Sequence, residues 1–401
     1  MRIQSNFHAR GNPMNRKIAD AIKDCGISDG AIIETWRRLV EIESFTHSPE
    51  SVRKVSRFIQ DQLEGLGLKT TVYEFANAGP LLIGDYGAGD KSEGIILAGH
   101  MDTVFKDGFV QDHPFKVEGN KVFGPGVLDM KGGINLIFYI VKLLIELGYA
   151  KPLKVIISGD EEHGHVNSDC GKRIVEESCG YKAAFNMETG LIDNGITIAR
   201  KGCMACTIKS RGLSAHAGAN FHDGISAIFE IANIIVKVQK LNDLDENTTF
   251  NVGTVRGGTI VNAVPDYAEI RVDIRFVEDN RTEKIVQNLN GIVQSNTVEG
   301  ATSELIIDSL FPSFASRHNR KLYEVVNAIS IRNGFGETKP VFLGGASDAA
   351  YIAKAGVPCL CSLGVRGQWN HTDREYALLD SARERIILVV NSILELENET
   401  L

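Results

Sequence analysis

The chain has 401 residues, of which 43% are hydrophobic and 23% charged, so it has room for about two globular domains and can bury a core without disulfide bonds. Its 43 Lys and Arg residues against 51 Asp and Glu residues give a formal net charge of −8, which lacks the basic character of a nucleic-acid-binding protein. The composition also excludes collagen-like, coiled-coil and intrinsically disordered chains.

The sequence gives no sign of a membrane or export segment. The longest apolar stretch, residues 134–147, is interrupted by Asn135, Lys142 and Glu146, so we expect no membrane span. The first residues contain no apolar region typical of a signal peptide, and Met14 is an alternative start. Seven cysteines, an odd number, without an export signal predict reduced thiols and a cytoplasmic protein.

The first part of the chain predicts an α/β domain. Residues 18–66 have apolar side chains at helical spacing with a break at 44–50, and residues 132–147 form a second helix that is apolar nearly all round. Short apolar runs predict buried strands at 95–98, 153–157, 183–187 and 357–363. Strands alternating with helices indicate a doubly wound, mostly parallel sheet, in which sites form at the carboxyl ends of the strands.

The pattern changes from about residue 201. Residues 268–276 alternate strictly between apolar and charged side chains, which predicts a half-exposed antiparallel strand. Segments 226–241 and 282–298 read as helices around it. We therefore expect an inserted α+β domain, an antiparallel sheet with two helices, at residues 201–313, between the two parts of the α/β domain at 1–200 and 314–401.

His100 and Asp102 stand at the end of the first predicted strand. Residues two apart in an extended segment point to the same side, so the Asp102 carboxylate can orient the His100 imidazole for metal binding. The alternative is a loop histidine beside a surface aspartate.

Glycines surround Asp129 before the buried helix at 132–147. Gly124 and Gly126 either let the backbone approach a ligand or form a tight turn, and Asp129 is either a ligand or the N-cap of the helix. The spacing matches neither a phosphate-binding loop nor a dinucleotide-binding fingerprint.

Further carboxylates follow the next two strands. Asp160, Glu161 and Glu162 follow the second strand; adjacent carboxylates at a buried strand end raise one another's pKa and require a cation or a proton-transfer task, unless they form an exposed acidic turn. Glu188 ends the third strand, and His371 precedes the last helix. Together, imidazoles and carboxylates at the strand ends of one sheet suit zinc or a related metal, and the surplus of carboxylates indicates two ions with a bridging ligand.

These motifs, in this order, resemble those of the di-zinc exopeptidase family, which includes acetylornithine deacetylases, succinyl-diaminopimelate desuccinylases, aminoacylases and bacterial glutamate carboxypeptidases. The resemblance runs from about residue 95 to the C-terminus and is nearest to the glutamate carboxypeptidase branch. The matching stretches are AGHMDTV (98–104), GPGVLDMKGG (124–133), GDEEHG (159–164), NMETG (186–190), SRGLSAHAG (210–218), GGTIVNAVPDYAEIRVDIR (257–275), GGASDAAY (344–351) and NHTDREY (370–376).

The resemblance implies two divalent metal ions, with zinc as the expected metal and cobalt or manganese as alternatives. His100 and Glu188 would bind one ion, and Glu162 and His371 would bind the other. Asp129 would bridge the two ions.

The resemblance also implies catalytic and substrate-binding roles. Glu161 would be the general base that acts on the metal-bound water, and Asp102 would support His100. His216, in the inserted dimerisation or lid domain, would reach the partner subunit's active site and stabilise the oxyanion. Asn262 and Arg275 would bind the carboxylate of the substrate.

The implied activity is hydrolysis of the amide bond to a C-terminal amino acid with a free carboxylate, by a homodimer formed through residues 201–313. The substrate would be a small peptide or, in the alternative of a deacylase, an N-acyl amino acid, with no nucleic-acid or membrane partner. The intact ligand set argues against a non-catalytic binding protein. The missing dinucleotide fingerprint argues against an oxidoreductase.

Two features depart from the family pattern or stand outside it. His163 and His165 come right after the carboxylate pair, and we expect them to have local structural roles; the alternative is a changed metal preference. Cys203 and Cys206 have the spacing of a redox or metal motif, but they lie in a predicted strand, where small buried thiols are common.

Overall fold

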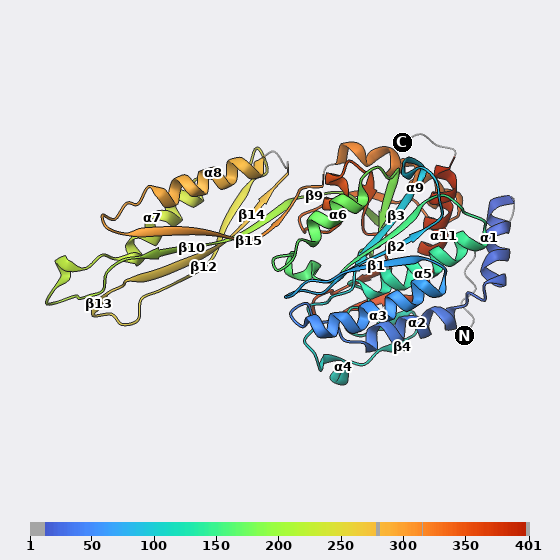
Figure 1. Ribbon diagram of the computed structural model, residues 1–401, viewed down its shortest axis with the longest axis horizontal. Coiled ribbons are helices and arrows are strands. Elements are labelled where there is room, and N and C mark those ends of the chain that lie inside the picture. Colours follow the sequence, from blue (N-terminus) through green and yellow to red (C-terminus); the bar gives the residue numbers. More distant parts are fainter. Residues whose placement is uncertain (1–12, 278–280, 315, 398–401) are drawn as a thin grey trace. The chain divides into compact units, whose positions relative to one another are not determined.

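The computed structural model describes residues 13–277, 281–314 and 316–397. They form two compact units. The first contains the described residues up to Ala199, residues 316–342 and the described residues from Ser347 onward. The second contains the described residues between Arg200 and 314 together with the short segment 343–346, which the sequence pattern had assigned to the α/β part. The predicted fold class, an α/β unit with an inserted α+β unit, is confirmed (Figure 1).

The first unit is built on a six-stranded sheet with the order β1-β2-β6-β3-β7-β17. Strands β6, β3, β7 and β17 are parallel, whereas β1 and β2 add an antiparallel edge. The mostly parallel sheet is therefore confirmed. The bounds are β1 (Lys69–Tyr73), β2 (Leu81–Tyr86), β3 (Ile95–His100), β6 (Leu153–Ser158), β7 (Ala183–Asn186) and β17 (Cys359–Leu360).

Helices lie on both sides of this sheet, and Figure 1 shows α6 across strands β1–β3 from α3 and α5. Helix α5 contacts α1, α2, α11 and β3. These contacts bury almost every side chain of α5, and this burial is the reason that the helix is apolar nearly all round. The bounds are α1 (Pro13–Asp24), α2 (Asp29–Glu41), α3 (Pro49–Gly65), α5 (Lys131–Glu146), α6 (Cys170–Ser178), α9 (Arg320–Arg332), α10 (Ala349–Lys354) and α11 (Leu379–Leu396).

A second sheet of the first unit, with the order β4-β5-β19-β18-β8, brings late and early parts of the chain together. Strand β8 begins two residues after Glu188 and pairs in parallel with β18, while β18 pairs with β19 across the loop that carries His371. The bounds are α4 (Phe109–Asp112), β4 (Lys116–Glu118), β5 (Lys121–Phe123), β8 (Gly190–Leu191), β18 (Arg366–Gln368) and β19 (Tyr376–Leu378), and a separate pair is β9 (Gly195–Arg200) with β16 (Lys339–Leu343).

The second unit is an antiparallel sheet with the order β12-β14-β10-β15, covered on one face by α7 and α8. Ile270, Val272, Ile274 and Phe276 of β14 all point into the core with these helices, as the alternation predicted. The bounds are β10 (Gly202–Arg211), β11 (Ala215–His216), α7 (Ala227–Gln239), β12 (Thr249–Gly257), β13 (Ala263–Val264), β14 (Tyr267–Phe276), α8 (Arg281–Gln294) and β15 (Thr302–Phe311).

All seven cysteines lie in the described residues, and none of them forms a disulfide bond with another. Cys203 and Cys206 both belong to β10; Cys206 is buried and Cys203 is half-buried, in keeping with a structural role. Across residues 13–277, 281–314 and 316–397, none of the helices combines the length and the apolar character needed to span a membrane.

Candidate metal centre

The three central parallel strands bring distant motifs to one edge of the sheet. Strand β3 lies between β6 and β7, and His100, its last residue, is level with Ser158 at the end of β6. Glu161 follows β6 by three residues, and Glu188 follows β7 by two. Because parallel strands end on the same side of a sheet, these side chains meet although they are up to 88 positions apart in the sequence. Their meeting at one sheet edge is what the strand-end motifs predicted.

The predicted metal ligands surround the Asp129 carboxylate. Asp129 Oδ1 lies 3.1 Å from His100 Nε2, which is also 3.4 Å from Glu188 Oε1. The other oxygen, Asp129 Oδ2, lies 3.1 Å from His371 Nε2, which is 3.2 Å from Glu162 Oε2. Asp129 therefore presents one oxygen to each imidazole.

The donor atoms fit divalent metal ions. Oxygen and nitrogen ligands about 2.0–2.1 Å from a tetrahedral zinc ion lie about 3.3 Å from one another, close to the 3.1–3.4 Å separations seen here. His100 Nδ1 lies 3.0 Å from the main-chain oxygen of Asp102, to which it can only donate, so Nε2 is free to coordinate a cation. Glu162 Oε1 is buried and has no hydrogen-bond partner among the described residues, as expected of a ligand atom.

Crowded carboxylates dominate the electrostatics of this edge. Burial raises the pKa of Glu161 well above its usual value; His100 opposes this rise, and the charge of Glu188 adds to it. Burial also raises the pKa of Glu162 to about 7, assisted by the charge of Asp129. Such a buried negative cluster is stabilised by cations.

Asp102 contacts both the His100 imidazole and the loop that carries Glu161 and Glu162. Its main-chain carbonyl oxygen is nearer to His100 Nδ1, at 3.0 Å, than its carboxylate oxygen Oδ1, at 3.3 Å. The carboxylate also accepts hydrogen bonds from the main-chain N–H groups of Glu161 at 3.2 Å and Glu162 at 3.0 Å. Both the carbonyl oxygen and the carboxylate of Asp102 thus face His100, and the carboxylate also holds the backbone of the two glutamates.

Two side chains that hold Asp129 were not found by sequence reasoning. Glu375 Oε1 accepts from the main-chain N–H groups of Leu128 at 2.7 Å and Asp129 at 3.1 Å, and Asn370 Nδ2 donates to Asp129 Oδ2 at 2.8 Å. Their proximity to His371 in the chain was the available signal. Asp129 is not the N-cap of α5; that position is Met130, and the Asp129–Met130 peptide bond is cis.

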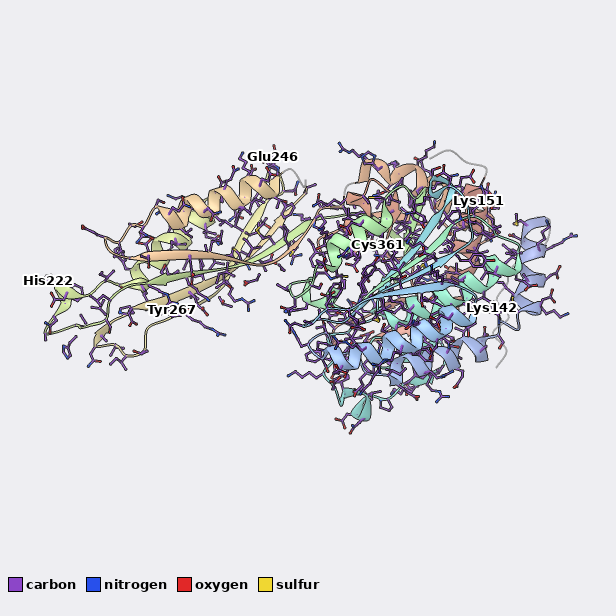
Figure 2. The ribbon with its side chains drawn as sticks, viewed as in Figure 1. Lys142, Lys151, His222, Glu246, Tyr267 and Cys361 are labelled. Atoms are coloured by element: carbon purple, nitrogen blue, oxygen red, sulfur yellow. The ribbon has the colours of Figure 1, made fainter. Side chains whose placement is uncertain are left out.

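His216 and Asn262 come together in the second unit through the pairing of β11 with β13, near the end marked by His222 in Figure 2. The main-chain N–H of Ala217 donates to the carbonyl oxygen of Asn262 at 3.0 Å. His216 is exposed, and its Nδ1 accepts from the main-chain N–H groups of residues 218 and 219, both at 3.1 Å. Nε2 must therefore carry the proton of the neutral ring and is a hydrogen-bond donor.

Arg275 lies elsewhere in the second unit, near the far end of β14, roughly 26 Å along the strand from Tyr267, where β14 begins. Its Nε and Nη2 donate to the two oxygens of Asp273 at 2.9 and 2.8 Å, and its Nη1 donates to the carbonyl oxygen of Gly344 at 3.0 Å. This unit therefore does not bring Arg275 beside His216. Among the residues that the structure describes, one N–H of each Nη has no acceptor, because a guanidinium carries five N–H groups.

The sequence of residues 96–395 matches Peptidase family M20/M25/M40. Since this match covers most of the chain, the chain belongs to that family. It is a metallopeptidase-type hydrolase, and the resemblance found in the motifs is confirmed.

Individual proteins agree with this assignment. The chain is 29% identical over 381 residues to carboxypeptidase G2 of Pseudomonas sp. (strain RS-16), covering 91% of this chain and 89% of that protein. It is 26% identical over 316 residues to acetylornithine deacetylase of Pasteurella multocida (strain Pm70), covering 71% and 77%. Among solved structures, aminopeptidase PepT of Bacillus cereus ATCC 10987 shares the fold with a TM-score of 0.75 and 23% identity, covering 93% of this chain and 100% of that chain.

Proposed function

We propose that this protein hydrolyses the amide bond to a C-terminal amino acid with a free carboxylate, as a carboxypeptidase that uses two divalent metal ions, with zinc as the expected metal. The observation that carries the proposal is the Asp129 carboxylate, whose two oxygens face the Nε2 atoms of His100 and His371. The 29% identity to carboxypeptidase G2 supports the carboxypeptidase assignment.

Five side chains would hold the two ions. His100 and Glu188 would bind one ion, Glu162 and His371 the other, and Asp129 both. When bound, the ions would lower the pKa of a water molecule and polarise the scissile carbonyl group.

Glu161 would be the general base. One oxygen of its carboxylate and one ligand atom each of His100 and Glu188 lie within 4.8 Å of one another. Among the described residues, Glu161 is not one of the side chains that lie 3.1–3.4 Å from His100 Nε2 or His371 Nε2. It would accept a proton from the attacking water and later deliver that proton to the leaving amine. Asp102 would hold it in place through the main-chain N–H of Glu161.

The second unit would contribute substrate contacts. The Nε2–H of His216 is available to donate to the oxyanion, because Nδ1 is occupied by two main-chain donors. Asn262, which lies beside His216, would contact the substrate from one subunit, and Arg275 would contact its carboxylate from the other, for which a guanidinium is well suited.

We further propose that the second unit forms a homodimer, so that His216 serves the active site of the partner subunit. Helix α7 exposes Ile228, Phe229 and Val236, with 42%, 61% and 55% of their surfaces accessible. The neighbouring strand β12 is an edge strand with an exposed Val255. An exposed apolar helix face beside an unpaired strand edge is the type of surface that a second copy of the chain buries in a dimer interface.

An N-acyl-amino-acid deacylase is the second candidate, because the similarity to acetylornithine deacetylase covers 71% of the chain and the chemistry requires the same residues. Only the group on the acyl side of the bond differs between the two activities. The lack of disulfide bonds among the described residues favours a reducing compartment such as the cytoplasm for either activity.

The test combines a substrate panel with a variant of the general base. Metal-reconstituted protein is assayed on dipeptides with different C-terminal residues and on N-acyl amino acids. Glu161→Gln should retain bound metal but lose about 10²–10⁴-fold in kcat. Glu176→Gln, an exposed glutamate on α6, is the matched control and should remain active. Full activity of Glu161→Gln would refute the mechanism.

A further inference from the structure

His165 is a buried imidazole held between two carboxylates. Its Nδ1 lies 2.6 Å from Asp160 Oδ1, and its Nε2 lies 2.6 Å from Asp348 Oδ1. At most 5% of each of these three side chains is exposed. Each ring nitrogen therefore lies at short hydrogen-bond distance from one carboxyl group, and His165 bridges the two.

The bridge closes the segment that carries the predicted general base. Asp160 immediately precedes Glu161, and the main-chain N–H of His165 donates to the Asp160 carbonyl oxygen at 3.1 Å. Asp348 immediately precedes α10, and its other oxygen, Oδ2, accepts from Ser158 Oγ at the end of β6 at 2.5 Å. Both ends of the segment 158–165 are therefore hydrogen-bonded to Asp348, one through Ser158 and the other through His165.

Glu161 and Glu162 lie inside this closed segment. Asp102 holds their main-chain N–H groups, and the backbone of Gly159 packs so closely on Gly79 that a Cβ at Gly79 would come within 2.1 Å of the Gly159 carbonyl oxygen. The turn is thus fixed by Asp102, by the packing of Gly159 and by the His165 bridge.

Two other roles for the cluster fit less well. Asp160, His165 and Cys170 bring possible ligand atoms within 4.8 Å of one another. However, separations of 2.6 Å between nitrogen and oxygen are those of direct hydrogen bonds and are shorter than the about 3.3 Å between ligands of a tetrahedral zinc ion. Burial raises the pKa of the Cys170 thiol to about 12, so it is neither a nucleophile nor a ready metal ligand at neutral pH.

We propose that His165 is a positioning residue for the hydrolytic reaction: by bridging Asp160 and Asp348 it fixes the turn that presents Glu161 and Glu162. The inference rests on the proposed function of Glu161. Without the bridge, the turn would be free to shift and would displace the general base from the water that it would activate. Displacements of about 1 Å cost as much as ~100-fold in rate. The effect therefore falls on kcat rather than on KM.

The test uses His165→Gln, which removes the bridge while largely filling its space, with the best substrate of the panel. We expect kcat to fall about 10–100-fold, as for other residues that orient a metal-site group, with KM within about threefold of the wild-type value and bound metal per subunit unchanged. His163→Gln is the matched control, because His163 lies in the same turn, is half-exposed and takes no part in the bridge; it should retain the wild-type kcat.

Asp348→Asn provides a second variant in case His165→Gln does not fold, since it preserves the shape of the side chain and the ring of His165. It should lower kcat in the same way. Wild-type kcat in the folded variants would overturn the inference, as would a fall in kcat that matches the loss of bound metal or of folded protein. Failure of the proposed function is distinguishable, because Glu161→Gln would then remain active.

Discussion

The carboxylate of Glu375 accepts a hydrogen bond from the main-chain N–H of Asp129 at 3.1 Å, although 246 positions separate the two residues. The same oxygen accepts from Leu128 at 2.7 Å, and only 3% of Glu375 is exposed. The loop that carries Asp129 is therefore held by a residue of the loop that carries His371. The orientation of the Asp129 carboxylate therefore depends on both loops.

Replacing Glu375 by Ala should weaken metal binding about 10–100-fold, because two buried N–H groups lose their acceptor and Asp129 is no longer held. Glu375→Gln keeps an oxygen that can accept from both N–H groups and should bind metal nearly as well as the wild type. Metal content after dialysis against a graded chelator measures the effect. Equal retention of metal by Glu375→Ala and the wild type would contradict this role.

Removal of metal should abolish activity and lower thermal stability. Without cations, the buried carboxylates of Asp129, Glu161, Glu162 and Glu188 repel one another. A metal present at about 100 times its Kd stabilises the folded state by about 2.7 kcal/mol, so exhaustive chelation should lower Tm by about 5 °C or more. Differential scanning calorimetry and activity after addition of zinc, cobalt or manganese provide the measurements. Undiminished activity in the fully chelated protein would exclude a metal-dependent mechanism.

His216→Ala should lower kcat about 10²–10³-fold, because a donor to the oxyanion is lost, while Tm stays unchanged since the side chain is exposed. His222→Ala, a second exposed histidine nearby, is the control and should remain active. Mixing subunits carrying His216→Ala with subunits carrying Glu161→Gln should restore activity in hybrid dimers, in which one site has both intact residues. The absence of any recovery in verified hybrids would show that His216 does not act across the dimer.

Phe229→Asp on α7 should convert the proposed dimer to monomers, because it places a charge in the exposed apolar face. Ile331→Asp is the matched control: Ile331 is exposed to a similar extent, 53% against 61%, but lies on α9 of the first unit. Sedimentation velocity measures the masses of both variants. A monomeric wild-type protein, or a dimeric Phe229→Asp variant, would contradict the proposed interface.

Glu177 should make stability depend on pH in the acid range. Burial alone would raise its pKa, but hydrogen bonds from Lys154 and Tyr73, both at 2.6 Å, hold the pKa below the usual value. A lowered carboxylate pKa gives stability that is present above the unfolded-state pKa, about 4.5, and is lost as pH falls through the folded-state pKa.

Glu177→Gln tests this dependence by urea denaturation at several pH values. The variant should be about 1–2 kcal/mol less stable than the wild type at neutral pH. The difference should shrink below the unfolded-state pKa, as Glu177 becomes protonated in the unfolded and then in the folded protein. A difference that does not vary with pH would show that the ionised carboxylate makes no contribution.

Much of the fold follows from local patterns in the sequence. The alternation in β14 predicts its buried face, and the uniformly apolar α5 predicts a helix enclosed by others. The meeting of His100 and Glu188 is also predictable, because each ends or follows a parallel strand and such strands end at one edge.

Other parts of the site depend on contacts that no local pattern encodes. Glu375 stands among other charged residues, and its role appears only when β18 and β19 bring its loop to Asp129. The bridge from His165 to Asp348 joins residues 183 positions apart. Likewise, the pairing of Arg275 with Asp273 on the same strand face is a choice of side-chain conformation, which a strand pattern leaves open.

The position of Asp102 has a consequence for how the site is loaded with metal. Its carbonyl oxygen fixes His100, a predicted ligand of the first ion, and its carboxylate fixes the backbone of Glu162, a predicted ligand of the second. The two proposed coordination spheres would thus share contacts with one residue, so that ordering either of them would order the other. Binding of the first ion should therefore increase the affinity for the second, and metal titrations of this protein should be cooperative.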